Sequence, residues 1–312
     1  MPDTMRAVTY DTFGGPEVLT IGEQPMPKVG PGEILVKVRR AAVNPVDWKI
    51  MSGGLDPLMQ AYFPVVPGWD VAGVVEQVGI DAPEFSVGDE VIAYARKDVL
   101  HGGTYAEYVT VPVRCAARKP STASWDEAAG LPLAGLTAYQ VLSRLGTTKD
   151  STVLIHGASG GVGLMAVQIA RHLGARVIGT ASEKNHDRLR ALGAEPVTYG
   201  DGLTDRVREL APSGVDVVAD FVGGVTDVTK AVLAEGGKHA SIADPEAIAA
   251  GGEWMWVRPD RDALGELADL VDSGELSIDV ATTFDLEHVA DAFTLSQEGH
   301  TSGKIIITVS DN

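Results

Sequence analysis

Glycines crowd one stretch of the sequence, residues 157–163, which reads Gly-Ala-Ser-Gly-Gly-Val-Gly. Residues 153–156 before it have the character of a short buried strand, and apolar residues recur at helical spacing from Val162 until Gly174, a common helix stop. Residues 176–180 predict a second strand. Strand, glycine turn, helix and strand in this order form a dinucleotide-binding unit. Backbone N–H groups at the helix N-terminus hold the pyrophosphate, and side chains there would block its approach.

The glycine pattern departs from G-x-G-x-x-G at one position, because Ala158 stands where the first glycine is expected. An ordinary tight turn between a strand and a helix is the alternative interpretation. The strand before the turn and the helix and strand after it favour nucleotide binding. We therefore predict contacts to the cofactor phosphates from the turn and the first helical residues, namely Ala158, Ser159, Gly160, Gly161 and Val162.

The elements that must position this turn alternate along residues 122–257. Ser124 and Glu127 have the spacing of a capping box that opens a helix. After the glycine unit, strands are expected near residues 196–198, 215–220 and 238–243, with helices near 184–192, 204–210 and 227–233. Such alternation predicts an α/β fold with a doubly wound parallel sheet.

The segments on either side have a different character. Residues 1–121 carry short Val-, Ile- and Tyr-rich runs at 6–10, 33–43, 71–78, 90–95 and 105–111, separated by Gly and Pro. They predict a small β-rich, barrel-like domain. In residues 258–312, a helix at 261–271 precedes a β-branched strand at 304–309, which could return to the first domain.

Composition restricts the possible functions. The 312 residues carry a formal net charge of −18, which argues against nucleic acid or an anionic membrane as partner. Cys115 is the only cysteine, so neither an intramolecular disulfide nor a multi-cysteine zinc site can form. We find no signal-peptide pattern at the N-terminus and no apolar run of membrane-spanning length. We expect a cytoplasmic protein.

Short motifs along nearly the whole chain resemble the medium-chain dehydrogenase/reductase superfamily, in particular its zinc-independent, zeta-crystallin-like quinone oxidoreductases. In order, they are Gly30-Pro-Gly-Glu33, Asn44-Pro-Val-Asp47, Pro67-Gly-Trp-Asp-Val-Ala-Gly73, Val87-Gly-Asp-Glu-Val91, Gly103-Thr-Tyr-Ala-Glu-Tyr108, Gly135-Leu-Thr-Ala138, the turn at 157–163 and Gly303-Lys-Ile-Ile306. The resemblance implies a GroES-like catalytic domain formed by both chain ends around an inserted Rossmann domain. It also implies a homodimer or tetramer joined at the Rossmann sheet edge, where the apolar residues 254–257 need a cover.

The zinc ligands of the superfamily's alcohol dehydrogenases are missing. Those enzymes carry a Cys where this chain has Asn44, and Gly-His-Glu where it has Gly68, Trp69 and Asp70. Asn and Trp are not zinc ligands, and one Asp does not hold the ion. We therefore predict no metal site.

The end of the second strand of the dinucleotide unit decides between NADH and NADPH, because NAD enzymes place an acid there. Here Ser182 takes that position and Lys184 follows, so that a hydroxyl donor and a positive charge are available for a 2′-phosphate. Glu183 would repel the phosphate if it turned inward. The alternatives are that Ser182 caps the next helix and that Lys184 is a solvated helix charge. We predict NADPH.

The resemblance implies further cofactor positions. Thr137 corresponds to a residue near the nicotinamide ribose, or is an internal helix threonine bonded to its own backbone. Tyr199 packs on the adenosine end, or lies in the core at a strand end. Val222 and Ala243 follow later strands, where ligands of open α/β sheets bind. We also predict Thr180 and Lys304 as cofactor-binding residues. The alternative for Lys304, which the sequence favours, is an ordinary strand lysine.

For the acceptor, we predict Asn44, Lys49 and Tyr62 as catalytic residues. The Asn44 amide could donate to an oxygen that gains negative charge, or Asn44 is a turn residue before Pro45 in a loop that Asp47 orders. Lys49 departs from the tyrosine of bacterial quinone oxidoreductases and is similar to plant enone and alkenal reductases. It could hold an enolate or the cofactor, or lie at the surface. Tyr62 is the nearest tyrosine and a candidate proton donor, or it is a packing residue.

Three functions follow from these residues. The first is an NADPH-dependent oxidoreductase that transfers hydride to a quinone or an α,β-unsaturated carbonyl. The second is an enoyl-thioester reductase of a biosynthetic pathway. The third is a non-enzymatic NADPH-binding protein. A quinone and an enone accept hydride by similar conjugate chemistry, so the residues permit either acceptor.

Overall fold

The computed structural model describes residues 2–311, which fold as two compact units. One, the β-rich unit, comprises residues 2–133, 259–273 and 278–311, and the other, the α/β unit, comprises residues 134–258 and 274–277. The predicted domain boundaries lay at 121/122 and 257/258. The first division falls later because helix α2 (Trp125–Gly130) packs against strands β3 (Glu33–Val43) and β5 (Asp70–Val78) of the β-rich unit.

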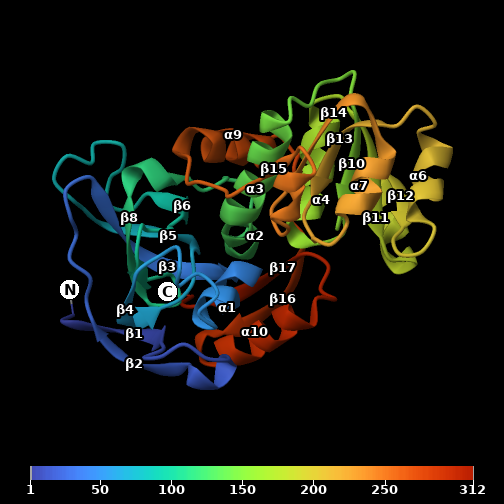
Figure 1. Ribbon diagram of the computed structural model, residues 1–312. Coiled ribbons are helices and arrows are strands. Elements are labelled where there is room, and N and C mark those ends of the chain that lie inside the picture. The colour runs from blue at the N-terminus through green and yellow to red at the C-terminus, as the bar shows by residue number, and fades with distance from the viewer. Residues whose placement is uncertain (1, 312) are drawn as a thin grey trace. The chain divides into compact units, whose positions relative to one another are not determined.

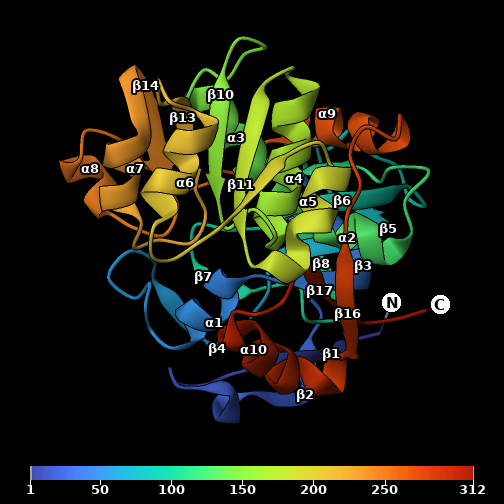
Figure 2. The same cartoon turned by 90° about the vertical axis from the view of Figure 1, so that its right-hand side faces the viewer.

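The α/β unit is built on a six-stranded parallel sheet in the order β12-β11-β10-β13-β14-β15 (Figures 1 and 2). The predicted strands are confirmed, except that β14 begins at Leu233 and ends at Ser241, whereas residues 238–243 were predicted. Strand order reverses between β10 and β13, as in a Rossmann sheet. The strands are β10 (Thr152–His156), β11 (Arg176–Ala181), β12 (Glu195–Thr198), β13 (Val215–Asp220), β14 (Leu233–Ser241) and β15 (Glu253–Trp254).

Helices pack against this sheet and bury its core. Leu154, Ile178 and Val218 from three neighbouring strands meet Val207 and Val232 from the helices. The predicted helices are confirmed with shifts of one or two residues. The helices are α3 (Pro132–Arg144), whose first two residues lie in the β-rich unit, α4 (Gly161–His172), α5 (His186–Ala191), α6 (Leu203–Leu210), α7 (Thr226–Val232) and α8 (Glu246–Ala249).

The β-rich unit contains a seven-stranded sheet in the order β16-β17-β3-β5-β6-β9, with β8 paired to β3. The predicted return of the last strand is confirmed: β17 pairs antiparallel with β3, so that Ile305 lies opposite Val43, and parallel with β16 (Figure 1). The remaining elements are β1 (Thr4–Thr9), β2 (Thr20–Pro25), β4 (Ala61–Val66), β6 (Glu90–Tyr94), β7 (Leu100–Gly102), β8 (Tyr108–Pro112), β9 (Ala116–Arg118), β16 (Val280–Asp285), β17 (Lys304–Thr308), α9 (Arg261–Asp272) and α10 (Val289–Glu298).

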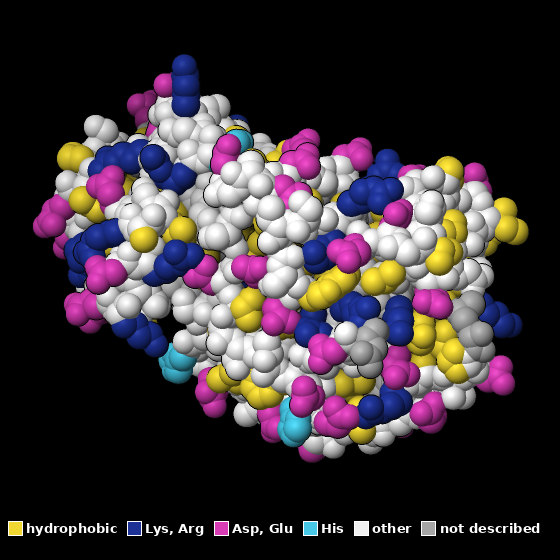
Figure 3. All heavy atoms as spheres, turned by 180° about the vertical axis from the view of Figure 1, so that it is seen from behind, with side chains coloured by type: hydrophobic (Ala, Val, Ile, Leu, Met, Phe, Trp, Pro, Cys, Tyr) yellow, Lys and Arg dark blue, Asp and Glu magenta, His cyan; other side chains and the backbone are white. Residues whose placement is uncertain are grey.

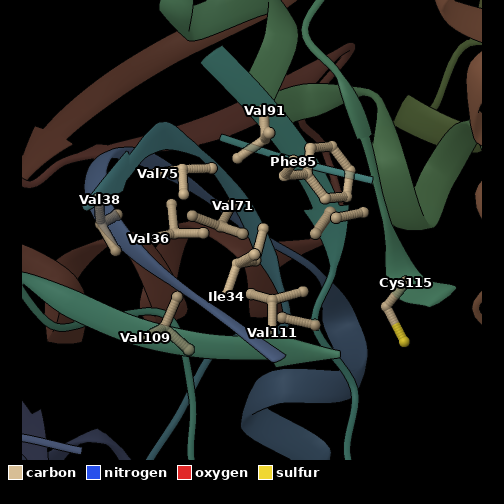
Figure 4. Close-up of a cluster of buried hydrophobic side chains, with 13 residues drawn as sticks. Ile34, Val36, Val38, Val71, Val75, Phe85, Val91, Val109, Val111 and Cys115 are labelled. Atoms are coloured by element: carbon tan, nitrogen blue, oxygen red, sulfur yellow. The ribbon is translucent and has the colours of Figure 1, made fainter. Parts of the chain in front are cut away.

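Valine side chains fill the core of this unit (Figure 4). Val36 and Val38 alternate along β3 and meet Val71 and Val75 of β5, because side chains two apart on a strand share one face. Cys115 is buried at the edge of this cluster. The β-branched runs of the sequence therefore form the core that holds the site described below.

One predicted loop is a helix. Residues 45–51 form α1 (Pro45–Met51), with Asn44 as its N-cap and Pro45 in its first turn. The N–H of Asn44 donates to Asp47 Oδ2 at 2.8 Å, which closes a capping box. The predicted loop after Asn44 is thus a helix, which Asn44 caps, since the capping box and the proline at the helix start favour a helix here.

Acidic side chains are spread over the surface with basic ones between them, as Figure 3 shows for one face. Among the helices of residues 2–311, none combines the length and apolar composition of a membrane-spanning segment.

Candidate functional site

The glycine turn after β10 is held by the neighbouring strand. The N–H of Gly157 donates to Thr180 Oγ1 at 3.1 Å, and the N–H of Ala158 donates to the Thr180 carbonyl at 3.0 Å. Gly157 has a φ of +70°, a conformation that favours glycine. Thr180 and Ala158 are both buried, so they support the turn from within.

Two other glycines let helix α4 begin close to this turn. A Cβ at Gly163 would lie 2.1 Å from the Gly157 carbonyl oxygen, so only glycine allows this approach. Gly160 is the N-cap of α4, whose first turn contains no acidic residue. The first N–H groups of an α-helix have no acceptor within the helix, and residues 159–162 are partly exposed. These residues therefore fit an anionic pyrophosphate.

The segment after β11 is polar and partly exposed. Ser182 is the N-cap of a short 3₁₀ helix (Glu183–Asn185) but makes no capping bond with its side chain. Its Oγ instead accepts from Asn185 Nδ2 at 3.3 Å. Lys184 and Glu183 are exposed, and so is Tyr199 after β12. The residues predicted to bind the adenosine end thus follow the carboxyl ends of the neighbouring strands β11 and β12.

The turns after β13 and β14 lie at the same edge, because all these strands are parallel. Val222 and Ala243 are exposed, as expected of positions that face a ligand. Thr137 is buried within α3. The sequence reasoning missed Asp220 and Ser241, which bind these two turns through buried hydrogen bonds. The signal that could have identified Asp220 was its position shortly before Gly223 and Gly224, because an aspartate ahead of glycines is common in Asx-turns.

The β-rich unit holds a buried polar cluster around Asn44. The Asn44 side-chain Nδ2 donates to Asp70 Oδ2 at 2.9 Å, and its Oδ1 accepts from Lys304 Nζ at 2.6 Å. Lys304 Nζ also lies 3.7 Å from Asp70 Oδ2. Asp70 Oδ1 accepts the N–H of Leu133 at 2.8 Å. Lys304 is 4% exposed, so it is not an ordinary surface lysine of its strand.

Asp47 lies beside this cluster. Its Oδ2 accepts from the N–H of Asn44 and from the hydroxyl of Tyr105, both at 2.8 Å. Its Oδ1 is buried and has no hydrogen-bond partner among residues 2–311. The sequence reasoning missed Tyr105, although the motif at 103–108 contains it.

Burial controls the charges of the cluster. It raises the pKa of Asp47 to about 7 and that of Asp70 to about 6, although hydrogen bonds to both carboxylates oppose the change. Burial also lowers the pKa of Lys304, which Asp70 and Asp47 oppose. Asp70 accepts two hydrogen bonds and lies beside the ammonium of Lys304, whereas one oxygen of Asp47 lacks a partner. Asp47 is therefore the carboxyl that takes up a proton first near neutral pH.

The other two predicted catalytic residues are exposed. Lys49 lies on α1, with its Nζ 5.5 Å from the centre of the Trp48 ring. The Tyr62 side chain is 56% exposed, whereas its neighbour Phe63 packs edge-on against Tyr10 and Phe13. The catalytic roles of Lys49 and Tyr62 stay predictions.

One unit has a parallel sheet whose strand order reverses, and the other has a β-rich sheet in which the last strand pairs with β3. Together these features define a dehydrogenase/reductase architecture. A family model described as alcohol dehydrogenase GroES-like domain matches residues 30–121, and one described as zinc-binding dehydrogenase matches residues 192–307. The chain belongs to the medium-chain dehydrogenase/reductase superfamily, in its quinone and alkenal/one oxidoreductase branch. The resemblance seen in the motifs is confirmed.

Several relatives span nearly the whole chain. The chloroplastic NADPH-dependent alkenal/one oxidoreductase of Arabidopsis thaliana is 34% identical, over 98% of this chain and 80% of its own length. The solved structure of a quinone oxidoreductase from Coxiella burnetii has a TM-score of 0.89 at 32% identity, and covers 98% of this chain and 100% of its own. A mycobacterial protein solved in complex with NADPH has a TM-score of 0.85 at 31% identity, again over 98% and 100%.

Proposed function

We propose that the protein is an NADPH-dependent oxidoreductase that transfers hydride to a quinone or an α,β-unsaturated carbonyl. The observation that carries this proposal is the glycine turn and α4 N-terminus at the reversal of strand order, in a chain whose relatives include an NADPH-dependent alkenal/one oxidoreductase and a quinone oxidoreductase. When bound, NADPH supplies the hydride, and the protein supplies position and electrostatics.

The residues that would hold the cofactor lie at the carboxyl ends of the parallel strands. The N–H groups at the start of α4 receive the pyrophosphate, with Thr180 fixing the turn before it. Ser182 and Lys184 receive the 2′-phosphate. The Ser182 hydroxyl already accepts from Asn185, so its own proton is available for donation.

The cofactor preference is tested by replacing both residues. Ser182→Ala/Lys184→Ala should lower the NADPH-over-NADH ratio of kcat/KM by about tenfold, because a lost charge-assisted bond is worth about 1.5 kcal/mol. Lys230→Ala, which removes an exposed lysine from α7, is the matched control and should keep the ratio. A wild type that prefers NADH would contradict the assignment.

A zinc-independent reaction is part of the proposal. Both oxygens of Asp70 already accept hydrogen bonds, and the ammonium of Lys304 lies beside them, where a metal ion would meet a positive charge. Within the described chain, no three His, Cys, Asp or Glu side chains gather closely enough to hold a metal ion. The residues present therefore do not fit a catalytic zinc. Activity should survive dialysis against EDTA, and added zinc should not raise it.

The acceptor oxygen needs a donor as hydride arrives, and the Asn44 amide is our choice. An amide nitrogen carries two hydrogens, of which Asp70 accepts one. Lys304 has only donors, so its bond to Oδ1 fixes which way the amide points. The second hydrogen then stabilises the negative charge that develops on the acceptor. Lys49 adds a positive charge on the same helix.

A steady-state assay tests the proposal. NADPH is supplied with 1,4-benzoquinone, 9,10-phenanthrenequinone, methyl vinyl ketone or a crotonyl thioester, and oxidation is followed at the cofactor's absorbance band. We expect turnover with the quinones or the enone. Turnover with the thioester alone would instead identify an enoyl-thioester reductase. Tight NADPH binding without turnover of any acceptor would identify a non-enzymatic binding protein.

A homodimer and a cytoplasmic location complete the proposal. Strand β15 is the last strand of the sheet in the α/β unit, and its residue Trp254 is 44% exposed, which favours a second copy of the chain as its cover. Size-exclusion chromatography with light scattering should give twice the chain mass of 32.7 kDa. A monomer would refute the dimer.

A further inference from the structure

The carboxylate of Asp220 joins two loops of the α/β unit. Its Oδ1 accepts the N–H groups of Val222 and Gly223, both at 2.9 Å, and its Oδ2 accepts the hydroxyl of Ser241 at 2.6 Å. Asp220 ends β13 and lies directly opposite Ser241 at the end of β14. Both side chains are buried, at 4% and 3% exposure.

Ser241 links the Asp220 carboxylate to the turn after β14 through hydrogen bonds. Its Oγ accepts the N–H groups of Ala243 at 3.1 Å and Asp244 at 2.9 Å, while its proton goes to Asp220. Asp244 is fixed further by the hydroxyl of Thr226, 3.0 Å from its Oδ2. The Asp220 carboxylate therefore fixes the conformation of the turn after β13 directly, and that of the turn after β14 through the Ser241 hydroxyl.

These turns lie against each other and against the glycine turn. A Cβ at Gly223, whose φ is +85°, would lie 3.2 Å from the Cβ of Ala243. A Cβ at Gly157 would lie 3.5 Å from the Cβ of Val222. The three turns form one continuous surface beside the reversal of strand order, where open α/β sheets bind their ligands.

In the part of the chain that the structure describes, no lysine or arginine forms an ion pair with Asp220. His156 lies opposite it on β10 and is 1% exposed, and burial lowers the pKa of this imidazole to about 4, so that it is neutral at pH 7. A buried carboxylate is costly unless donors surround it. The donors here are N–H groups of the first turn and the Ser241 hydroxyl, so the shape of both turns depends on the carboxylate.

We propose that Asp220 and Ser241 are positioning residues of the cofactor site, which hold the turns carrying Val222 and Ala243 in a shape that binds the half of NADPH remote from its 2′-phosphate. This inference rests on the proposed function, because NADPH binding belongs to that proposal. The sheet order supports it: β13 and β14 lie on one side of β10, whereas β11, which Ser182 follows, lies on the other. Each half of a dinucleotide binds to one side of such a reversal.

The test compares NADPH with adenosine 2′,5′-bisphosphate, which lacks the nicotinamide half. In Ser241→Ala, calorimetric titration should give about a tenfold higher Kd for NADPH, as expected for a lost buried hydrogen bond. The Kd for the bisphosphate should stay within about twofold of wild type. Ser241→Thr keeps the hydroxyl and should restore NADPH affinity.

Ser151→Ala is the matched control, because Ser151 is also buried and its Oγ accepts the N–H of Thr148 at 3.0 Å, before β10 at the opposite edge of the sheet. It should leave both Kd values unchanged. Hydrogen exchange without ligand reports the turn itself: the amides of Ala243 and Asp244 should exchange at least about tenfold faster in Ser241→Ala.

Two results would overturn the inference. In the first, Ser241→Ala binds NADPH as wild type does, although its amides exchange faster. In the second, the variant loses affinity for both ligands equally, which reports general damage. A wild type that binds the bisphosphate and NADPH equally weakly would instead refute the proposed function.

Discussion

Gly163→Ala places a methyl group where helix α4 meets the turn before it. The added Cβ would lie 2.1 Å from the Gly157 carbonyl oxygen and 2.7 Å from the Cα of Ala158. Both neighbours are backbone atoms, which cannot rotate away as a flexible side chain can. The helix and the turn must therefore separate, and the N–H groups that face the pyrophosphate move with them.

The cost follows from two opposing effects. Overpacking a well-packed contact of this kind costs about 3 kcal/mol. Replacing glycine by alanine within a helix favours the folded state by about 1 kcal/mol. The net loss of about 2 kcal/mol corresponds to a fall in Tm of roughly 4–8 °C for a unit of this size. NADPH affinity should fall as well.

Gly160→Ala, three residues earlier, separates folding from binding. Gly160 has a φ of −77° and a ψ of 172°, which any residue adopts, and a Cβ there would lie 3.4 Å from the Gly157 oxygen. Alanine at an N-cap costs at most about 1 kcal/mol relative to glycine. The methyl group would, however, stand where the phosphate approaches, so the Kd for NADPH should rise about tenfold or more.

Thermal unfolding without ligand and NADPH titration together decide the matter. Gly163→Ala should lose both stability and affinity, and Gly160→Ala mainly affinity. Unchanged Tm and affinity in Gly163→Ala would refute the close approach of helix and turn. Wild-type affinity in Gly160→Ala would refute the path of the pyrophosphate over this residue.

Three further predictions concern the β-rich unit. Because burial raises the pKa of Asp47 from 3.8 to about 7, the folded state binds a proton there that the unfolded chain has released, and stability falls as pH rises through this range. Urea unfolding at pH 5 and pH 8 should therefore show a smaller loss for Asp47→Asn than for wild type, and equal losses would contradict the assignment. Lys304→Met should cost about 3–5 kcal/mol in urea unfolding, because it leaves the buried Asp70 without its cation, and Asp70→Asn in the same chain should recover most of it. Ser124→Ala should cost about 1 kcal/mol, since the Ser124 Oγ accepts the N–H of Glu127, and an unchanged Tm would show that this cap is not needed.

Local patterns were enough to predict the strands and helices of the α/β unit. Strand β13 follows the predicted residues 215–220, and the glycine turn lies between its predicted strand and helix, because both depend on neighbours in sequence. Helix α1 was missed because its seven residues are too few to show a helical period. Its capping residues, Asn44 and Asp47, were visible and read as a loop.

The acceptor side of the site depends on contacts that the sequence does not display. Asn44 and Lys304, whose side chains bond, are 260 residues apart in the chain. The residues next to Lys304 in the sequence do not indicate its burial, because a lysine on an exposed strand can be flanked by the same residue types. Asp220, by contrast, was missed although its local Asx-turn pattern was visible in the sequence. The cofactor-binding role was assigned to Val222 in the same turn, and not to the aspartate that holds the turn.

The pairing of β3 with β17, the last strand, also affects the order in which the two units can fold during synthesis. The α/β unit takes nearly all its residues from one continuous segment, 134–258, so it can fold while the chain is still being made. The β-rich unit cannot pair β3 with β17 until residues 304–308 have left the ribosome. Until then, residues 40–43 of β3 have no partner strand on this side and the carboxylate of Asp70 has no cation, so this edge of the nascent sheet is open to pairing with other strands.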